Sequence, residues 1–258
     1  MNFNYNTNQI YYETYGKGPA LVLLHGFLES SAMWEKLISQ LEKNNFVITL
    51  DFPGHGKSDV ISEIHSMELM AGVVEQLLEH LQIDSTTFVG HSMGGYVTMA
   101  YAELFPEKME RLILLNSTPA ADTEEKKEIR NRSLKVFEKN PSAFISMAIS
   151  NLFAETSRQK FSKEIESLKE EANSFPLNGI KAALKGMRDR KDRTKVLKNF
   201  NKEKYSILSE SDPLLELEET KKLAESCNSK VITIDGGHHS TYENLNGVLK
   251  NLTHILET

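Results

Sequence analysis

Short apolar runs alternate with longer segments of helical periodicity along most of this 258-residue chain. Six runs rich in Val, Ile and Leu predict strands that are buried on both faces: Ala20–Leu24, Phe46–Leu50, Thr86–Val89, Arg111–Leu115, Tyr205–Leu208 and Val231–Ile234. Between and after them, apolar residues at helical spacing predict helices at Ala32–Glu42, Met67–Leu81, Met93–Leu104, Glu216–Glu225 and Leu245–Leu256. This alternation indicates βαβ units, and therefore an α/β fold with a doubly wound, mostly parallel sheet.

Two segments depart from the alternation. Gln9–Tyr15 alternates less cleanly and predicts an antiparallel strand at an edge of the sheet. Residues 120–198 contain no strand-like run, are densely charged and keep their apolar residues at helical spacing. We expect this stretch, called the cap segment below, to be a helical insertion over the end of the sheet. The predicted domains are therefore a core of residues 1–119 and 199–258, and a cap of residues 120–198.

Composition excludes several classes of protein. Thirty Lys and Arg against 36 Asp and Glu give a net charge of -6, which argues against a general nucleic-acid binder. The single cysteine, Cys227, can form no intramolecular disulfide, and no cysteine cluster or other ligand motif predicts a metal or cofactor. The N-terminus has no signal-peptide pattern, and the apolar stretches are too short to span a bilayer. We expect a cytoplasmic protein without membrane insertion that acts on a small molecule.

The predicted strand at Thr86–Val89 runs into a G-x-S-x-G pattern centred on Ser92, and a predicted helix follows directly at Met93–Leu104. This strand–turn–helix context exposes a nucleophilic serine above the end of a sheet. Glycine is needed on both sides of the turn, because a Cβ at Gly90 or Gly94 would collide with neighbouring backbone. The start of the helix also points free N–H groups toward any negative charge that develops there.

Three further segments accompany this turn. The chain reads H-G-F at 25–27, D-F-P-G-H-G-K-S at 51–58 and G-H at 237–238. With these four motifs in this order, the chain resembles the α/β-hydrolase family over nearly all of its length outside the cap segment. The resemblance implies a mostly parallel sheet of about eight strands with a helical cap insertion.

The resemblance also implies roles for individual residues. Ser92 matches the family's nucleophile, His238 its base, and Asp212, after the predicted strand at Tyr205–Leu208, the acid that orients the histidine. The backbone N–H groups of Phe27 and Met93 match the oxyanion hole, where each donor is typically worth about 10²–10³ in rate.

Neighbouring residues compete for two of these roles. His239 adjoins His238, although only His238 follows a glycine as in the family pattern. Glu210 and Asp235 are the rivals of Asp212 as the acid. Some family members place the acid after the preceding strand, where this chain carries Asn116, which is not an acid.

We therefore predict a serine hydrolase that cleaves a small carboxylic ester or thioester through an acyl-enzyme. Serine at position 92 argues against dehalogenase and epoxide-hydrolase activity, since those members of the fold need aspartate there. Two alternatives remain open: a lyase or carbon–carbon hydrolase similar to the menaquinone-pathway synthase, and a ligand receptor built on the hydrolase scaffold. An arginine of the cap segment, Arg188 or Arg190, directed into the pocket would favour the lyase.

Overall fold

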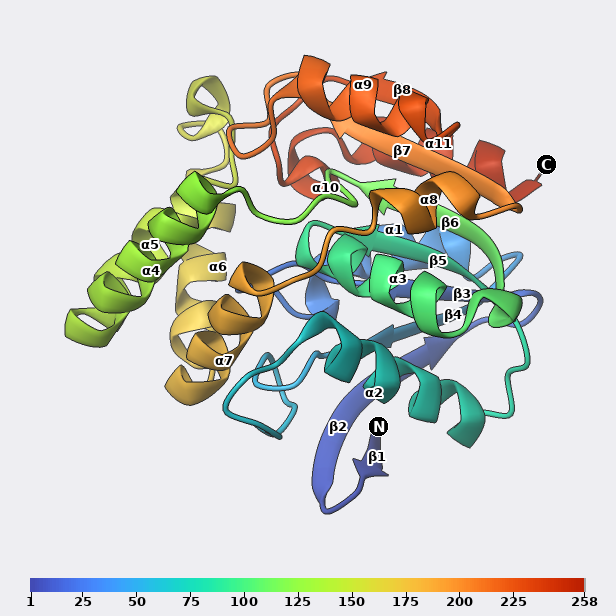
Figure 1. Ribbon diagram of the computed structural model, residues 1–258, viewed down its shortest axis with the longest axis horizontal. Coiled ribbons are helices and arrows are strands. Elements are labelled where there is room, and N and C mark those ends of the chain that lie inside the picture. The colour runs from blue at the N-terminus through green and yellow to red at the C-terminus, as the bar shows by residue number, and fades with distance from the viewer. Residues whose placement is uncertain (258) are drawn as a thin grey trace.

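The computed structural model describes residues 1–257, and within them the strands form a single sheet of eight in the order β1-β2-β4-β3-β5-β6-β7-β8 (Figure 1). All neighbouring pairs from β4 to β8 are parallel, whereas β1 pairs with β2, and β2 with β4, in antiparallel register. The strands are β1 Asn2–Tyr5, β2 Asn8–Tyr15, β3 Ala20–Leu24, β4 Phe46–Leu50, β5 Thr86–His91, β6 Met109–Leu115, β7 Glu203–Ser209 and β8 Lys230–Ile234. The predicted α/β fold with a mostly parallel sheet of eight strands is confirmed.

One strand prediction needs a correction. The strand predicted at Gln9–Tyr15 is present and antiparallel, but it does not lie at the edge of the sheet. Asn2–Tyr5 forms a further strand outside it, with Phe3 opposite Ile10. This first strand is only four residues long and has one buried side chain, Phe3, so it carries almost no apolar pattern to recognise.

The central strands are apolar on both faces because successive side chains point to opposite sides of a sheet. In β3, Val22 and Leu24 contribute to the core on one side, and Leu21 and Leu23 to the core on the other. All four side chains are at most 1% exposed. The apolar run in the sequence is therefore unbroken because its alternate residues pack into two different cores, one on each face of the sheet.

Helices cover both faces of the sheet. The apolar residues of three helices pack in the core on one face: α2 Met67–His80, α3 Met93–Leu104 and α8 Thr194–Asn199. Those of two others pack in the core on the opposite face: α1 Glu35–Leu41 and α11 Leu245–Glu257. The short 3₁₀ helix η1, Ser31–Trp34, leads directly into α1. The remaining elements of the core are η2 Pro106–Lys108, α9 Leu217–Ser226 and α10 Ser240–Glu243.

The cap segment is helical, and its first four helices gather to one side of the sheet, at the left of Figure 1. They are α4 Glu124–Lys139, α5 Pro141–Ser150, α6 Ser162–Asn173 and α7 Leu177–Arg188, with the 3₁₀ helix η3 Glu155–Ser157 between α5 and α6. Its division from the core as a separate domain stays a prediction. Within residues 1–257, no helix has the length and apolar character needed to cross a bilayer.

Two glycines bring α7 directly against the loop that follows β4. A Cβ at Gly179 would fall on the backbone of Gly54, and a Cβ at Gly186 would fall on the carbonyl of His65. The backbone N–H of His65 also donates to the carbonyl of Ala182, at 3.1 Å. The cap segment is thus held against the core by backbone contacts that leave no room for side chains.

Candidate active site

Ser92 occupies a sharp turn between β5 and α3, with φ 50° and ψ -114°. Such a backbone conformation is strained for a residue with a side chain, and strain of this kind concentrates at functional sites. The turn is possible because both flanking glycines lack a Cβ. At Gly90 it would collide with the Thr98 hydroxyl and the Gly94 carbonyl, and at Gly94 with the carbonyl of Leu24. The steric argument made from the sequence therefore holds in the structure.

His238 links Ser92 to Asp212 through two short hydrogen bonds. Its Nε2 lies 2.8 Å from the Ser92 hydroxyl oxygen, and its Nδ1 lies 2.7 Å from Oδ2 of Asp212. An ionised carboxylate can only accept, so Nδ1 carries the proton and Nε2 is left to accept from the serine hydroxyl. The three residues come from the ends of β5, β7 and β8, which meet at the carboxyl edge of the parallel sheet.

Asp212 is held ionised by its neighbours. Burial by itself would raise its pKa, but electrostatic attraction to the His238 ring and the hydrogen bond from it hold the pKa of this carboxyl below its usual range. The backbone N–H groups of Leu214 and Leu215 also donate to Oδ1, at 2.8 and 3.0 Å. These amides fix the carboxylate in the orientation that meets the imidazole.

The residues that competed for the roles of base and acid take no part in these hydrogen bonds. His239 is fully buried, and its Nδ1 lies 3.0 Å from the Thr241 hydroxyl instead of facing Ser92. Burial lowers the pKa of His239 to about 4, so its ring is neutral at pH 7. Glu210 and Asp235 are exposed, and the His238 ring bonds to neither of them. The geometry therefore joins Ser92 to His238 and Asp212.

A buried ion pair beneath the serine turn was missed from the sequence. Nδ1 of His91 lies 3.0 Å from Oε2 of Glu29, and Nε2 of His91 lies 2.9 Å from the backbone carbonyl of His238. Burial would lower the pKa of His91, but the carboxylate of Glu29 raises it above its usual value, and both ring nitrogens face acceptors. Glu29 also accepts from the backbone N–H of Gly26, at 2.6 Å.

This pair connects three parts of the site: the loop after β3, the turn at Ser92 between β5 and α3 (the serine turn), and the turn after β8 that carries His238 (the histidine turn). His91, the residue before the serine, thereby holds the backbone carbonyl of His238 in place. Sixty-two residues separate Glu29 from His91, so no spacing rule would have paired them.

Asn116, at the end of β6, is a second residue whose importance only the structure reveals. Its amide nitrogen lies 2.8 Å from the backbone carbonyl of His238 and 2.9 Å from the Ser209 hydroxyl, and its amide oxygen accepts from the backbone N–H of Ser209 at 2.8 Å. The side chain is fully buried and φ is 45°. The position that is an acid in some family members is here an amide that fastens β7 to the histidine turn.

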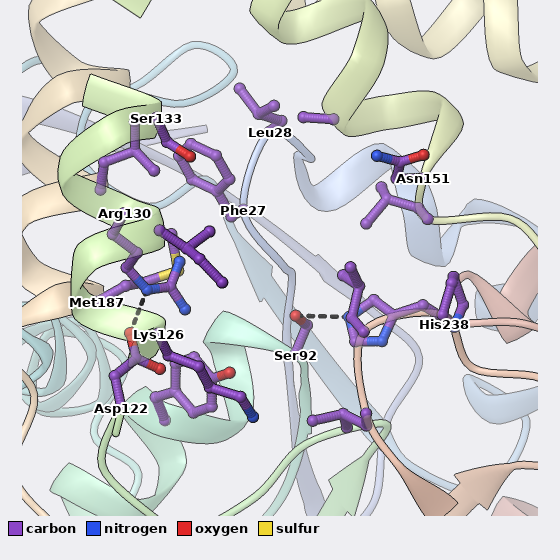
Figure 2. A pocket seen from close by; sticks show the side chains of 18 of the residues that line it. Phe27, Leu28, Ser92, Asp122, Lys126, Arg130, Ser133, Asn151, Met187 and His238 are labelled. Carbon is purple, nitrogen blue, oxygen red and sulfur yellow. Dashed lines mark hydrogen bonds and ion pairs between the residues drawn. The ribbon is translucent and has the colours of Figure 1, made fainter. Parts of the chain in front are cut away.

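A cavity of about 410 Å³ opens at Ser92, between the end of the sheet and the cap segment (Figure 2). This volume lies in the range of pockets that hold small ligands. The predicted oxyanion residue Phe27 lines the cavity, whereas the side chain of Met93 is fully buried in the core. Most of the lining is apolar: Phe27, Leu28, Ile129, Phe144, Met147, Ala148, Leu152, Leu184, Met187, Pro213, Leu214 and Leu215.

The two arginines singled out in the cap segment differ in position. Arg188 forms an ion pair with Asp189, at 2.7 Å, and does not line the cavity. Arg190 does line it, but its guanidinium bonds to Asp122 at 2.7 Å and to the backbone carbonyls of Ala120 and Met187 at 3.1 and 2.9 Å. Arg190 is therefore engaged by the protein itself, and its position does not favour the lyase.

No three His, Cys, Asp or Glu side chains in the described part of the chain are arranged to hold a metal ion.

Comparison with known proteins agrees with this geometry. The family model of the alpha/beta hydrolase fold matches residues 19–245. An uncharacterized protein of Mycobacterium tuberculosis is 39% identical over 102 residues, which are 40% of this chain and 30% of that protein. The pimeloyl-[acyl-carrier protein] methyl ester esterase of Vibrio vulnificus is 32% identical over 113 residues, which are 44% of this chain and 42% of that protein. The matches thus span less than half the length of these curated relatives.

A thermophilic esterase from Thermogutta terrifontis, solved with malate bound, is similar over the whole fold. Its TM-score is 0.91 at 28% sequence identity, and the match covers 97% of this chain and 93% of that one. Because the family model spans nearly the whole sequence, and the fold and the serine turn agree with it, the chain belongs to the alpha/beta hydrolase fold family.

Proposed function

We propose that this protein is a serine hydrolase that cleaves a small carboxylic ester or thioester through an acyl-enzyme on Ser92. The observation that carries the proposal is the chain of hydrogen bonds from Ser92 through His238 to Asp212, at 2.8 and 2.7 Å. A serine hydroxyl is a weak nucleophile unless a positioned base removes its proton, and this chain supplies both the base and the group that orients it.

In the first half of the reaction, Ser92 attacks the carbonyl carbon of the ester while its proton passes to Nε2 of His238. The Asp212 carboxylate stabilises the imidazolium, and the imidazolium then protonates the departing alcohol or thiol. In the second half, His238 takes a proton from water as the water oxygen attacks the acyl carbon. The bond to Ser92 then breaks, the imidazolium returns its proton to the Ser92 oxygen, and the acid is released.

Two backbone donors are suited to the negative charge that develops on the carbonyl oxygen. As the first residue of α3, Met93 has an N–H that no earlier turn of the helix can use. Phe27 lies in the loop after β3 that is closed by the hydrogen bond from Gly26 to Glu29, and its side chain lines the cavity. Donors held in place before the reaction are worth more than mobile ones, because they need no reorganisation as the charge develops.

The similar proteins support the reaction class. The relative from Vibrio vulnificus is a methyl ester esterase, and the structural relative from Thermogutta terrifontis is an esterase. The mostly apolar lining of the cavity in this chain is suited to an acyl or alcohol group with hydrocarbon character.

The test is hydrolysis of p-nitrophenyl esters from acetate to decanoate by the wild type and by Ser92→Ala. We expect turnover that peaks at one chain length and falls by about 10⁴-fold or more in the variant. Ser174→Ala, at an exposed serine outside the cavity, is the control and should keep wild-type activity. Negligible turnover by a wild type whose Ser92 still reacts with a fluorophosphonate would exclude these esters and favour the lyase or carbon–carbon hydrolase.

A further inference from the structure

The wall of the cavity on the cap side carries an excess of positive charge. Lys126 and Arg130 from α4 and Arg190 from the loop after α7 line it, together with one carboxylate, Asp122. Figure 2 shows Lys126, Arg130 and Asp122 on one side of the cavity, with Ser92 and His238 on the other. Three cationic side chains against one anionic side chain leave two positive charges in excess on this wall.

Asp122 and Arg190 form an ion pair that anchors this wall of the cavity. The Asp122 side chain is 1% exposed and pairs with both Arg190, at 2.7 Å, and Nε of Arg130. Arg190 also lies over the ring of Tyr96, with its guanidinium carbon 4.0 Å from the ring centre. The single carboxylate is thus shared by two guanidinium groups and neutralises only one of them.

Arg130 and Lys126 keep donors for a ligand. Arg130 uses Nε on Asp122, and its Nη1 meets only the Met187 sulfur, at 3.8 Å, which is a weak acceptor. Lys126 lies one helical turn earlier on the same face of α4, and among residues 1–257 its ammonium forms no ion pair. The Arg130 side chain is only 22% exposed, so it is not an ordinary solvated surface cation.

We propose that Lys126 and Arg130 bind a carboxylate at the end of the substrate remote from the ester, so that the enzyme prefers half-esters of dicarboxylic acids. This inference rests on the proposed ester hydrolysis at Ser92. A guanidinium binds carboxylates well because its N–H groups match the two oxygens, and partial enclosure strengthens the attraction. The apolar side chains of Leu28, Phe144 and Leu184 line the same cavity and are suited to the methylene chain between the two ends.

The experiment compares p-nitrophenyl half-esters of adipic and suberic acid with p-nitrophenyl hexanoate and octanoate, which have the same carbon number but no carboxylate. We expect kcat/KM of the wild type to be higher for the half-esters. Arg130→Gln should lower it for the half-esters by about tenfold or more, and Lys126→Gln by about threefold, with less than a twofold change for the neutral esters.

Two neighbouring residues of α4 provide matched controls. Arg132 is exposed and donates to the backbone of Glu128, and Lys127 pairs with Glu124, while neither of them lines the cavity. Arg132→Gln and Lys127→Gln remove the same charge from the same helix and should leave both classes of ester unaffected. Equal losses for charged and neutral esters in Arg130→Gln, with no loss in Lys126→Gln, would overturn the proposal.

A binding measurement separates failure of this inference from failure of the proposed function. Calorimetry with adipate on Ser92→Ala requires no turnover, so it remains informative if none of the esters is hydrolysed. We expect adipate to bind Ser92→Ala and to bind the double variant Ser92→Ala, Lys126→Gln at least threefold more weakly. Adipate that fails to bind, or binds both proteins equally, would refute the carboxylate site even if Ser92 proves to be the nucleophile.

Discussion

The two walls of the cavity are built in different ways. The wall at the end of the sheet consists of tight turns after β3, β5, β7 and β8, whose buried polar groups are joined by hydrogen bonds of 2.6–3.0 Å. The wall on the cap side consists of long side chains from helices, such as Arg130 at 22% exposure and Ile129 at 49%. We therefore propose that the first wall carries the reaction and tolerates little change, whereas the second selects the substrate.

The strongest test of this contrast lies on the sheet wall, at Asp212. We expect Asp212→Asn to lower kcat by about 10⁴-fold on p-nitrophenyl esters, because an amide at this position no longer favours the histidine tautomer that accepts the serine proton. Glu210→Gln, two residues away and exposed, is the control and should leave kcat unchanged. If Asp212→Asn remains active while Glu210→Gln does not, the two acids have been assigned the wrong way round.

The rigidity of the same wall is tested at the serine turn. Gly94→Ala places a Cβ against the backbone carbonyls of Leu24 and His25, and we expect it to lower the free energy of unfolding by about 3 kcal/mol. The control is Gly72→Ala in α2, where the nearest atom is the Tyr5 hydroxyl at 3.9 Å. That change should stabilise the protein by about 0.5–1 kcal/mol in urea unfolding. Equal effects at both glycines would show that the serine turn is not closely packed.

On the cap wall, the buried carboxylate of Asp122 makes stability depend on pH. Burial alone would raise its pKa, but Arg130 and Arg190 hold the pKa of this carboxyl below its usual range. The folded state therefore binds the proton less tightly than the unfolded chain. The ion pairs contribute fully above about pH 4, and their contribution is lost as the pH falls through the pKa of the folded state.

We expect Asp122→Asn to lower the free energy of unfolding by about 2 kcal/mol at pH 7 and the difference from wild type to shrink below about pH 4. Urea unfolding at pH 7, 5 and 3 measures this difference in the free energy of unfolding. Asp189→Asn, which removes a more exposed partner of Arg188, should cost less than about 0.5 kcal/mol at pH 7. If the difference for Asp122→Asn stays constant from pH 7 to pH 3, the Asp122 carboxyl is not the group whose titration changes the stability.

The smallest effect is expected at the apolar edge of the cap wall. Ile129 is 49% exposed and lines the cavity, so Ile129→Ser should lower kcat/KM by about threefold for p-nitrophenyl octanoate and leave the acetate ester unaffected. Val136→Ser, at a residue of α4 that is 45% exposed and outside the cavity, is the matched control. A larger loss with acetate than with octanoate would mean that Ile129 affects the reaction centre rather than the acyl chain.

Much of the fold could be predicted because its signals are local. The predicted strands Ala20–Leu24 and Phe46–Leu50 and the predicted helix Met93–Leu104 coincide with β3, β4 and α3. A strand buried on both faces leaves a short unbroken apolar run, and the glycine-flanked serine marks where the helix begins. Asn2–Tyr5 was missed because a four-residue strand with one buried side chain leaves no such pattern. The position of Ser92 in its turn was equally local, because the G-x-S-x-G pattern describes the geometry of a single turn.

Residue patterns alone predicted the α/β fold, the helical character of residues 120–198, and the candidates Ser92, Asp212 and His238. The pairing of Glu29 with His91, the hydrogen bonds from Asn116 to the histidine turn, and the sharing of Asp122 by Arg130 and Arg190 emerged only from the folded chain. These contacts are not local in the sequence. Periodicity and turn geometry are properties of neighbouring residues, whereas these contacts join residues between 8 and 122 positions apart. The contacts of Glu29 and Asn116 exist only once the sheet order brings the strand ends together, and Arg130 and Arg190 share Asp122 only once α4 packs against α7.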